Sequence, residues 1–202
     1  MNHQLAHDLV AYWDRLRDDA AQPDRRALDL AQIRRWLPWI AMLDADEDRG
    51  FPIRSAGAGI CSLFGRELLG TSFAALWRLT ERAAVSEMLD CALAGTVPVS
   101  SPVYAEPRDR ALLELELLVL PFAHRGHQGA RALCALMPST LPSWIGLIPV
   151  GPLSWQPVVS EAPAHLLTRA SAAAHTPRFS THSNLPLRSS LVPCTFSSLQ
   201  GV

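Results

Sequence analysis

Residues 59–77 read Gly-Ile-Cys-Ser-Leu-Phe-Gly-Arg-Glu-Leu-Leu-Gly-Thr-Ser-Phe-Ala-Ala-Leu-Trp, and this stretch decides the fold of the chain. Apolar residues recur at helical spacing until Gly65, start again, and are interrupted a second time by Gly70. A helix of one or two turns is unstable alone in water, because nucleation is costly and few hydrogen bonds follow it. The stretch therefore predicts short helical segments that lie across an apolar surface.

Extended segments are expected on both sides of this stretch. Two of them, 39–43 and 51–56, precede it around a charged turn, and a helix over 80–95 follows it. The remaining expected strands are 97–106, 112–120 and 131–137. In the strand over 112–120, leucine alternates with glutamate, which is typical of a strand with one buried face and one solvated face. This order predicts an α+β fold, a five-stranded antiparallel sheet with helices on one face.

An amphipathic helix is expected at the N-terminus, over residues 4–18. Its apolar stripe consists of Leu5, Leu9, Tyr12, Trp13 and Leu16. This stripe either packs on the helix's own domain or contacts a second subunit. Because the predicted sheet leaves no surface for it, and exposed apolar patches usually mark contact sites, we expect a homodimer held by these five residues.

Four segments follow from the changes in composition along the chain. We expect an N-terminal helical segment over 1–37, the main domain over 38–140, and a Pro- and Trp-rich extension over 141–156 that packs on the domain. Residues 157–202 are dominated by Ser, Thr, Pro and Ala without periodicity. We expect this tail to be disordered, and its deletion to leave the fold and its stability nearly unchanged.

The overall composition excludes several classes of protein. The chain has 202 residues, a net charge of −1 and no lysine, which excludes a P-loop lysine and disfavours nucleic-acid binding. Residues 132–160 carry no charge, but five prolines interrupt them, so no membrane span is expected. The four cysteines lack CxxC spacing, and no signal peptide is recognisable. A reduced, cytoplasmic location is therefore expected.

The sequences of several segments resemble those of the PAS domain family. The most specific segment is Leu63–Trp77, and the others are Ala11–Arg17, Arg54–Gly57 and Trp144–Leu153. Together they are most similar to bacterial stand-alone PAS proteins. The resemblance covers about residues 10–155 and implies a sensory or regulatory domain with the strand order derived above.

The resemblance also implies a cavity between sheet and helices, where PAS-like domains often hold a cofactor. Flavin photoreceptors of this family carry a reactive cysteine where this chain has Phe73, and haem-binding members use a histidine from the helix that here lacks one. We therefore expect no flavin adduct and no haem. The space between sheet and helices is either filled by core side chains or open to a small apolar ligand. The residues expected to line it are Phe64, Phe73, Trp77, Leu89, Leu115, Leu117 and Leu133.

No catalytic or metal-binding constellation stands out. Gly57-Ala58-Gly59 opens a helix, but a dinucleotide fingerprint needs a third glycine where Ser62 stands. Cys61 lies among apolar residues and is expected to be a small core residue rather than a nucleophile. His3 and His7, one helical turn apart, are expected on a solvated face.

Three candidate functions follow for this chain. The first is a signalling or regulatory protein that binds a partner protein and is gated by a small apolar ligand. The second is an enzyme or small-molecule binding protein that uses the same cavity, and the absence of a nucleophile–base pair argues against the enzyme. The third is nucleic-acid binding, which the charge balance disfavours. The first function is the one we expect.

Overall fold

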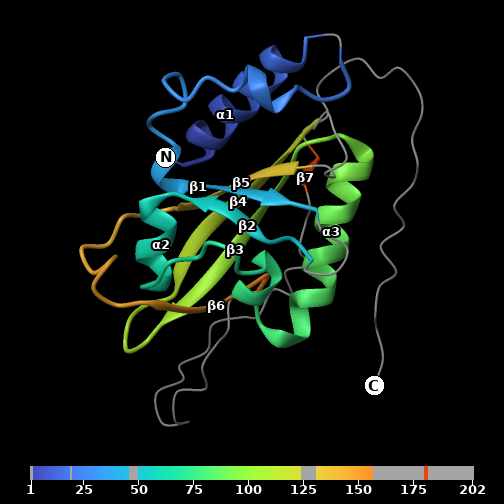
Figure 1. Ribbon diagram of the computed structural model, residues 1–202. Helices are drawn as coiled ribbons and strands as arrows, with labels where there is room; N and C mark the ends of the chain where they lie inside the picture. The colour runs from blue at the N-terminus through green and yellow to red at the C-terminus, as the bar shows by residue number, and fades with distance from the viewer. Residues whose placement is uncertain (1, 19, 46–49, 124–130, 157–179, 182–202) are drawn as a thin grey trace.

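One antiparallel sheet lies between α1 on one face and the other helices on the opposite face (Figure 1). The computed structural model describes residues 2–18, 20–45, 50–123, 131–156 and 180–181. The sheet order is β2-β1-β5-β4-β3-β6, and β7 also pairs with β3. The strands are β1 (Ile40–Asp44), β2 (Ile53–Ala56), β3 (Val99–Pro107), β4 (Leu113–Phe122), β5 (Arg131–Pro138), β6 (Val150–Ser154) and β7 (Ser180–Thr181). The predicted α+β fold is confirmed. Two further strands, β6 and β7, pair with β3 and enlarge the sheet.

The three α-helices lie where the sequence predicted helices, over 4–18, within 59–77 and over 80–95. Gly65 ends α2 with a left-handed φ of 63°, which glycine adopts without strain. The α-helices are α1 (Asn2–Arg17), α2 (Ala58–Phe64) and α3 (Arg82–Gly95). The 3-10 turns are η1 (Arg25–Ala27), η2 (Leu37–Trp39), η3 (Phe73–Leu76) and η4 (Leu79–Glu81). The helix expected over 80–95 is therefore divided into η4 and α3.

The first hydrophobic core fills the space between the sheet and the layer of α2, η3 and α3. Leu113, Leu115, Leu117 and Val119 of β4 point into it, as the alternation predicted. Ile60 and Leu63 of α2 and Val85, Met88 and Leu89 of α3 meet them from the helical side. Each short helix is thus stabilised by the apolar face that it buries.

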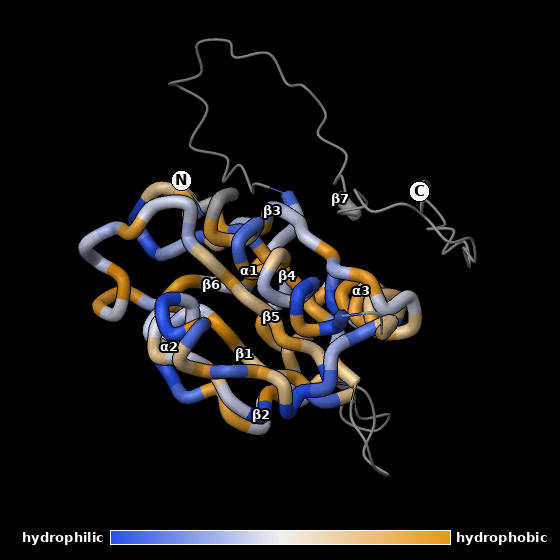
Figure 2. The backbone as a smooth tube through the Cα atoms, turned by 90° about the horizontal axis from the view of Figure 1, so that it is seen from above, coloured by the Kyte–Doolittle hydropathy of each residue, from blue (hydrophilic) through white to orange (hydrophobic). Residues whose placement is uncertain are grey.

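The second core lies on the opposite face of the sheet, beneath α1. Leu118, Leu120 and Phe122 of β4 are buried there together with Leu9 and Trp13 of α1, and the arrangement of α1 beside β4 and β5 is visible from above in Figure 2. The predicted helical layer thus covers one face, and the predicted N-terminal helix covers the other. The central strands are apolar on both faces, so each face needs a cover.

Hydrogen bonds fix α1 in this position. Trp13 Nε1 donates to the backbone oxygen of Pro121 in β4 at 2.7 Å. Trp36 Nε1 donates to the oxygen of Leu5 at 3.0 Å, and the backbone N–H of Asp29 donates to the hydroxyl of Tyr12 at 2.9 Å. The segment between α1 and β1 therefore closes the second core from outside.

The expectation that the stripe on α1 lacks a surface within its own chain is wrong. Leu9, Tyr12 and Trp13 are buried in the second core, and Leu5 and Leu16 pack against its margin. Because the stripe is covered within its own chain, it does not support a dimer held by these five residues. The homodimer itself stays a prediction, and it would need a different contact surface.

The C-terminal extension contributes a strand that the sequence did not predict. Ser154 and Leu153 of β6 pair with Tyr104 and Ala105 of β3, and the register shifts before Pro107. The Cβ of any residue larger than glycine at Gly151 would lie 2.9 Å from the backbone oxygen of Glu106. Glycine is thus required for β6 to approach β3 at this irregularity. The predicted disordered tail, 157–202, lies outside the described residues except for β7.

The burial of Leu9 gives a direct test of this fold. Leu9 is 1% exposed, whereas Leu79 is 78% exposed. We expect Leu9→Ala to lower the free energy of unfolding by about 2–5 kcal/mol, because it leaves a cavity in the second core. The matched control, Leu79→Ala, should change it by less than about 0.5 kcal/mol. Urea denaturation of both variants measures the difference, and equal effects would contradict the placement of α1.

Candidate functional site

Trp77 occupies the centre of the candidate site, at the end of η3 and against β6. It forms a parallel bridge with Leu153, and the next backbone N–H, of Arg78, donates to the oxygen of Leu153 at 3.0 Å. The ring of Trp77 lies 4.2 Å from that of Trp155 and 6.3 Å from that of Phe73. These contacts tie the helical layer to the last strand of the sheet.

The indole N–H of Trp77 is a buried donor for which the described residues supply no acceptor. The side chain is fully buried, and its Nε1 makes no hydrogen bond. An unsatisfied buried donor costs about 1–3 kcal/mol. Native structures seldom leave such a group unpaired, and a bound water or ligand is a common explanation. An additional molecule with an acceptor would therefore be stabilised at this atom.

Polar contacts hold the two tryptophans in place. The backbone N–H of Trp155 donates to Glu81 Oε2 at 3.3 Å, and Arg82 Nε donates to the backbone oxygen of Trp77 at 3.2 Å. Burial raises the pKa of Glu81, although the Trp155 N–H and the charge of Arg78 oppose this shift. Glu81 of η4 thus binds the residue that follows β6, and Arg82 of α3 fixes the backbone at Trp77.

The structure brings together six of the seven residues predicted to line the cavity. Phe73, Trp77, Leu89, Leu115 and Leu117 are buried in the first core, and Phe64 packs against it half-buried. They form a packed cluster beside the Trp77 N–H.

Leu133 was assigned to this group wrongly. It points into the second core, whereas its neighbour Cys134 points into the first. Successive residues of a strand face opposite sides of the sheet, so the phase predicted for β5 was off by one residue.

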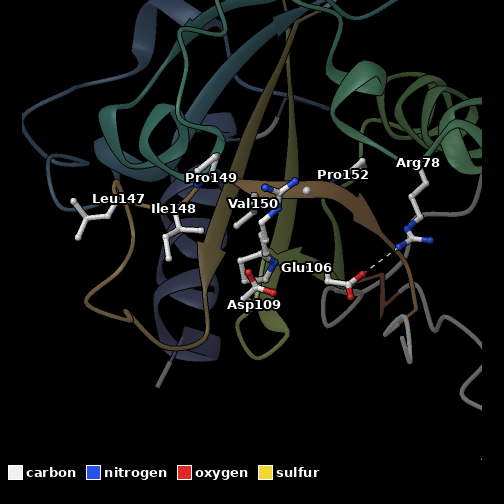
Figure 3. A pocket seen from close by; sticks show the side chains of 11 residues that line it. Arg78, Glu106, Asp109, Leu147, Ile148, Pro149, Val150 and Pro152 are labelled. Atoms are coloured by element: carbon white, nitrogen blue, oxygen red, sulfur yellow. Dashed lines mark ion pairs between the residues drawn. The ribbon is translucent and has the colours of Figure 1, made fainter. Parts of the chain in front are cut away.

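A groove lies on the outer side of β6, apart from the predicted cavity residues (Figure 3). Its volume is about 630 Å³, and none of the seven predicted residues lines it. Arg78 and Glu106 form an ion pair of 3.6 Å at one end, and Leu147 and Ile148 lie at the other. This groove could not be predicted from the sequence, because β6 was not predicted.

The cysteine in the organising stretch is not activated as a nucleophile. Burial and the neighbouring carboxylate of Glu67 raise the pKa of the Cys61 thiol. The two atoms, Cys61 Sγ and Glu67 Oε2, are 3.9 Å apart. Reactive cysteines need the opposite, an electropositive surrounding that lowers the pKa.

Gly57 and Gly59 serve close backbone packing. A Cβ on Gly57 would lie 2.0 Å from the backbone oxygen of Leu37, and one on Gly59 would lie 2.8 Å from that of Pro38. The two glycines thus allow α2 to pack directly on η2. This contact accounts for the glycine pattern without a phosphate.

A buried carboxylate joins three strands at one end of the sheet. Asp44 of β1 hydrogen-bonds Arg54 of β2, and its other oxygen lies 2.7 Å from Nε of Arg131 of β5. This second contact is an ion pair whose atoms are not aligned as a hydrogen bond. Two guanidinium groups compensate the burial of Asp44, which points to a structural role.

In the part of the chain that the structure describes, no group of three or more His, Cys, Asp and Glu residues could hold a metal ion. No helix within the described ranges has the length and apolar character needed to span a bilayer.

Comparison with known families decides the identity of the domain. A PAS domain model matches residues 1–137, a range that begins before α1 and ends in β5. The chain belongs to the PAS domain family. The match includes the helix that covers the second core, so α1 is part of the PAS unit in this protein. No curated protein matches the chain.

The glycine packing of the PAS domain predicts a position-specific effect. We expect Gly57→Ala to lower the free energy of unfolding by about 2–3 kcal/mol, because its Cβ would overlap a backbone oxygen. Gly95→Ala is the matched control. Its Cβ would meet Val97 Cγ2 at 3.5 Å, an ordinary contact, and should leave the stability unchanged or slightly higher. Thermal unfolding compares the two, and a neutral Gly57→Ala would contradict the packing of α2 on η2.

The two buried indoles form a second matched pair. Trp13→Phe deletes the bond to Pro121 and leaves a buried carbonyl unpaired, whereas Trp77→Phe deletes a donor that has no acceptor. We expect Trp13→Phe to cost about 1–2 kcal/mol more than Trp77→Phe in protein refolded from denaturant. Urea denaturation gives both values. A larger loss for Trp77→Phe would show that its N–H is already satisfied.

Proposed function

We propose that this PAS domain protein is a regulator that binds a partner protein, and that a small ligand in the first core gates this binding. The observation that carries the proposal is the buried N–H of Trp77, for which the described residues offer no acceptor. The ligand is mostly apolar, because the side chains of the first core, Phe73, Leu89 and Leu117 among them, are apolar. It carries one hydrogen-bond acceptor that faces Trp77.

The contacts of Trp77 explain how a ligand changes the surface of the protein. Trp77 stacks on Trp155 and bridges Leu153, so an atom inserted beside its indole displaces β6 or the helical layer. Arg78, the next residue, lines the outer groove with Glu106. The ligand's presence would thus be transmitted to a surface that a partner protein can contact.

The proposal includes no catalysis, flavin or haem. The raised pKa of Cys61 argues against a thiol nucleophile. Within the described residues, Cys61 and Cys134 carry free thiols, which fits the reducing environment of the cytoplasm, where we place this regulator. A ligand-binding protein without a protein partner is the second candidate, and the same Trp77 N–H supports it.

Native mass spectrometry of the protein from its own cells tests the ligand. We expect one small molecule bound per wild-type chain, and a loss of at least tenfold in occupancy in Trp77→Phe. Trp144→Phe is the control, because Trp144 lies at the margin of the first core and should keep the ligand. Equal occupancy in the two variants would contradict the role of Trp77.

The gating is tested separately by capture of proteins from native lysate. Ligand-loaded and ligand-stripped forms of the wild-type protein are immobilised at equal density. We expect one protein to be captured at least fivefold better by one form than by the other. Identical capture by both forms would refute gating and favour the second candidate.

A further inference from the structure

The two edges of the sheet are covered in different ways. At the β2 edge, residues 70–73 follow the strand closely: Ile53 N–H donates to Thr71 at 2.9 Å, and Gly70 N–H donates to Ile53 at 2.8 Å. Phe73 N–H donates to Phe51 at 2.8 Å. This segment therefore covers the start of the β2 edge, at Phe51 and Ile53, with hydrogen bonds from within the domain.

The β3 edge is covered by β6 over its second half only. β6 pairs with Tyr104, Ala105 and Pro107, and it ends at Ser154. The chain leaves the edge there because Trp155 turns into the first core and stacks on Trp77. β6 therefore does not extend to the first half of β3, from Val99 to Val103.

The tail returns to this first half. Ser180 pairs with Ser100 and Thr181 pairs with Val99, both in antiparallel orientation. β7 thus runs in the same direction as β6, along the same edge. Their ends on β3, opposite Tyr104 and Ser100, are about 13 Å apart at about 3.3 Å per residue. Residues 155–179 connect them and are long enough to span this distance many times.

We propose that the first half of the β3 edge is a docking site for an extended strand, and that its occupant is the Ser180–Thr181 segment of the same chain. The segment is held weakly, because two residue pairs contribute few ladder hydrogen bonds and each bond adds little net stability. Ordering a long connection opposes them. The edge therefore alternates between a covered state and an open state that accepts another strand.

Proline substitution in the full-length chain tests the pairing. In an antiparallel ladder, successive residues direct their N–H groups to opposite neighbours, so one amide of Val99 and Ser100 faces β7. We expect the double variant Ser180→Pro with Thr181→Pro to raise the hydrogen-exchange rate of that amide at least tenfold. The control variant, Ser171→Pro with Ala172→Pro, carries the same number of prolines earlier in the tail and should leave the rate unchanged. Equal rates in both variants and the wild type would overturn the proposal.

A labelled peptide of residues 175–186 tests the site and its occupant together. We expect it to bind the Ser180→Pro, Thr181→Pro variant at least fivefold more tightly than the wild type, because the tail of the wild type competes for the edge. It should also restore slow exchange at the edge amide. Equal affinity for both proteins would overturn occupancy by the tail.

Dilution distinguishes the chain's own tail from that of a second copy. Exchange protection of the edge amide should be the same at all protein concentrations, and light scattering gives the mass at each of them. Protection that is lost on dilution together with a halving of the mass would assign the strand to a second subunit and overturn the proposal.

Discussion

The burial of β4 and β5 on both faces is the constraint on which the rest of the structure depends. Leu117 and Leu118 are adjacent in β4, yet each belongs to a different core. A sheet with two apolar faces must be covered twice, because exposed apolar area of this size is unfavourable in water. The helical layer of α2, η3 and α3 covers one face. α1 covers the other, and its hydrogen bond from Trp13 to β4 fixes its position.

Much of this fold could be predicted from residues 59–77, because short helices ended by Gly65 and Gly70 need an apolar sheet beneath them. The phase of β5 could not, because residues 132–137 are apolar throughout and alternation gives no distinction between Leu133 and its neighbours. The same uninterrupted pattern in 117–122 was the available signal for a second core. The alternation at Glu114 and Glu116 suggested one solvated face for the whole strand, but this alternation holds only for the first half of β4.

The extension and the candidate site were harder to predict for different reasons. β6 contains Gly151 and Pro152, residues that usually argue against a strand, and it forms because Gly151 can approach Glu106 closely. The sequence correctly placed Phe73 and Trp77 in the core. It could not show that the Trp77 N–H lacks an acceptor among the described residues, because this depends on atoms contributed by β6 and α3. The groove beside Arg78 depends on β6 in the same way.

Trp155 connects the two proposals physically. Its ring covers Trp77 in the first core, and the turn that brings it there takes the chain away from the β3 edge after Ser154. A ligand that separates the two indoles would release Trp155, and β6 could then extend along β3 toward Val103. Such an extension would approach the position where β7 pairs, at Val99 and Ser100. Ligand binding and tail docking would therefore be coupled through the same strand edge, with a coupling free energy that acts equally in both directions.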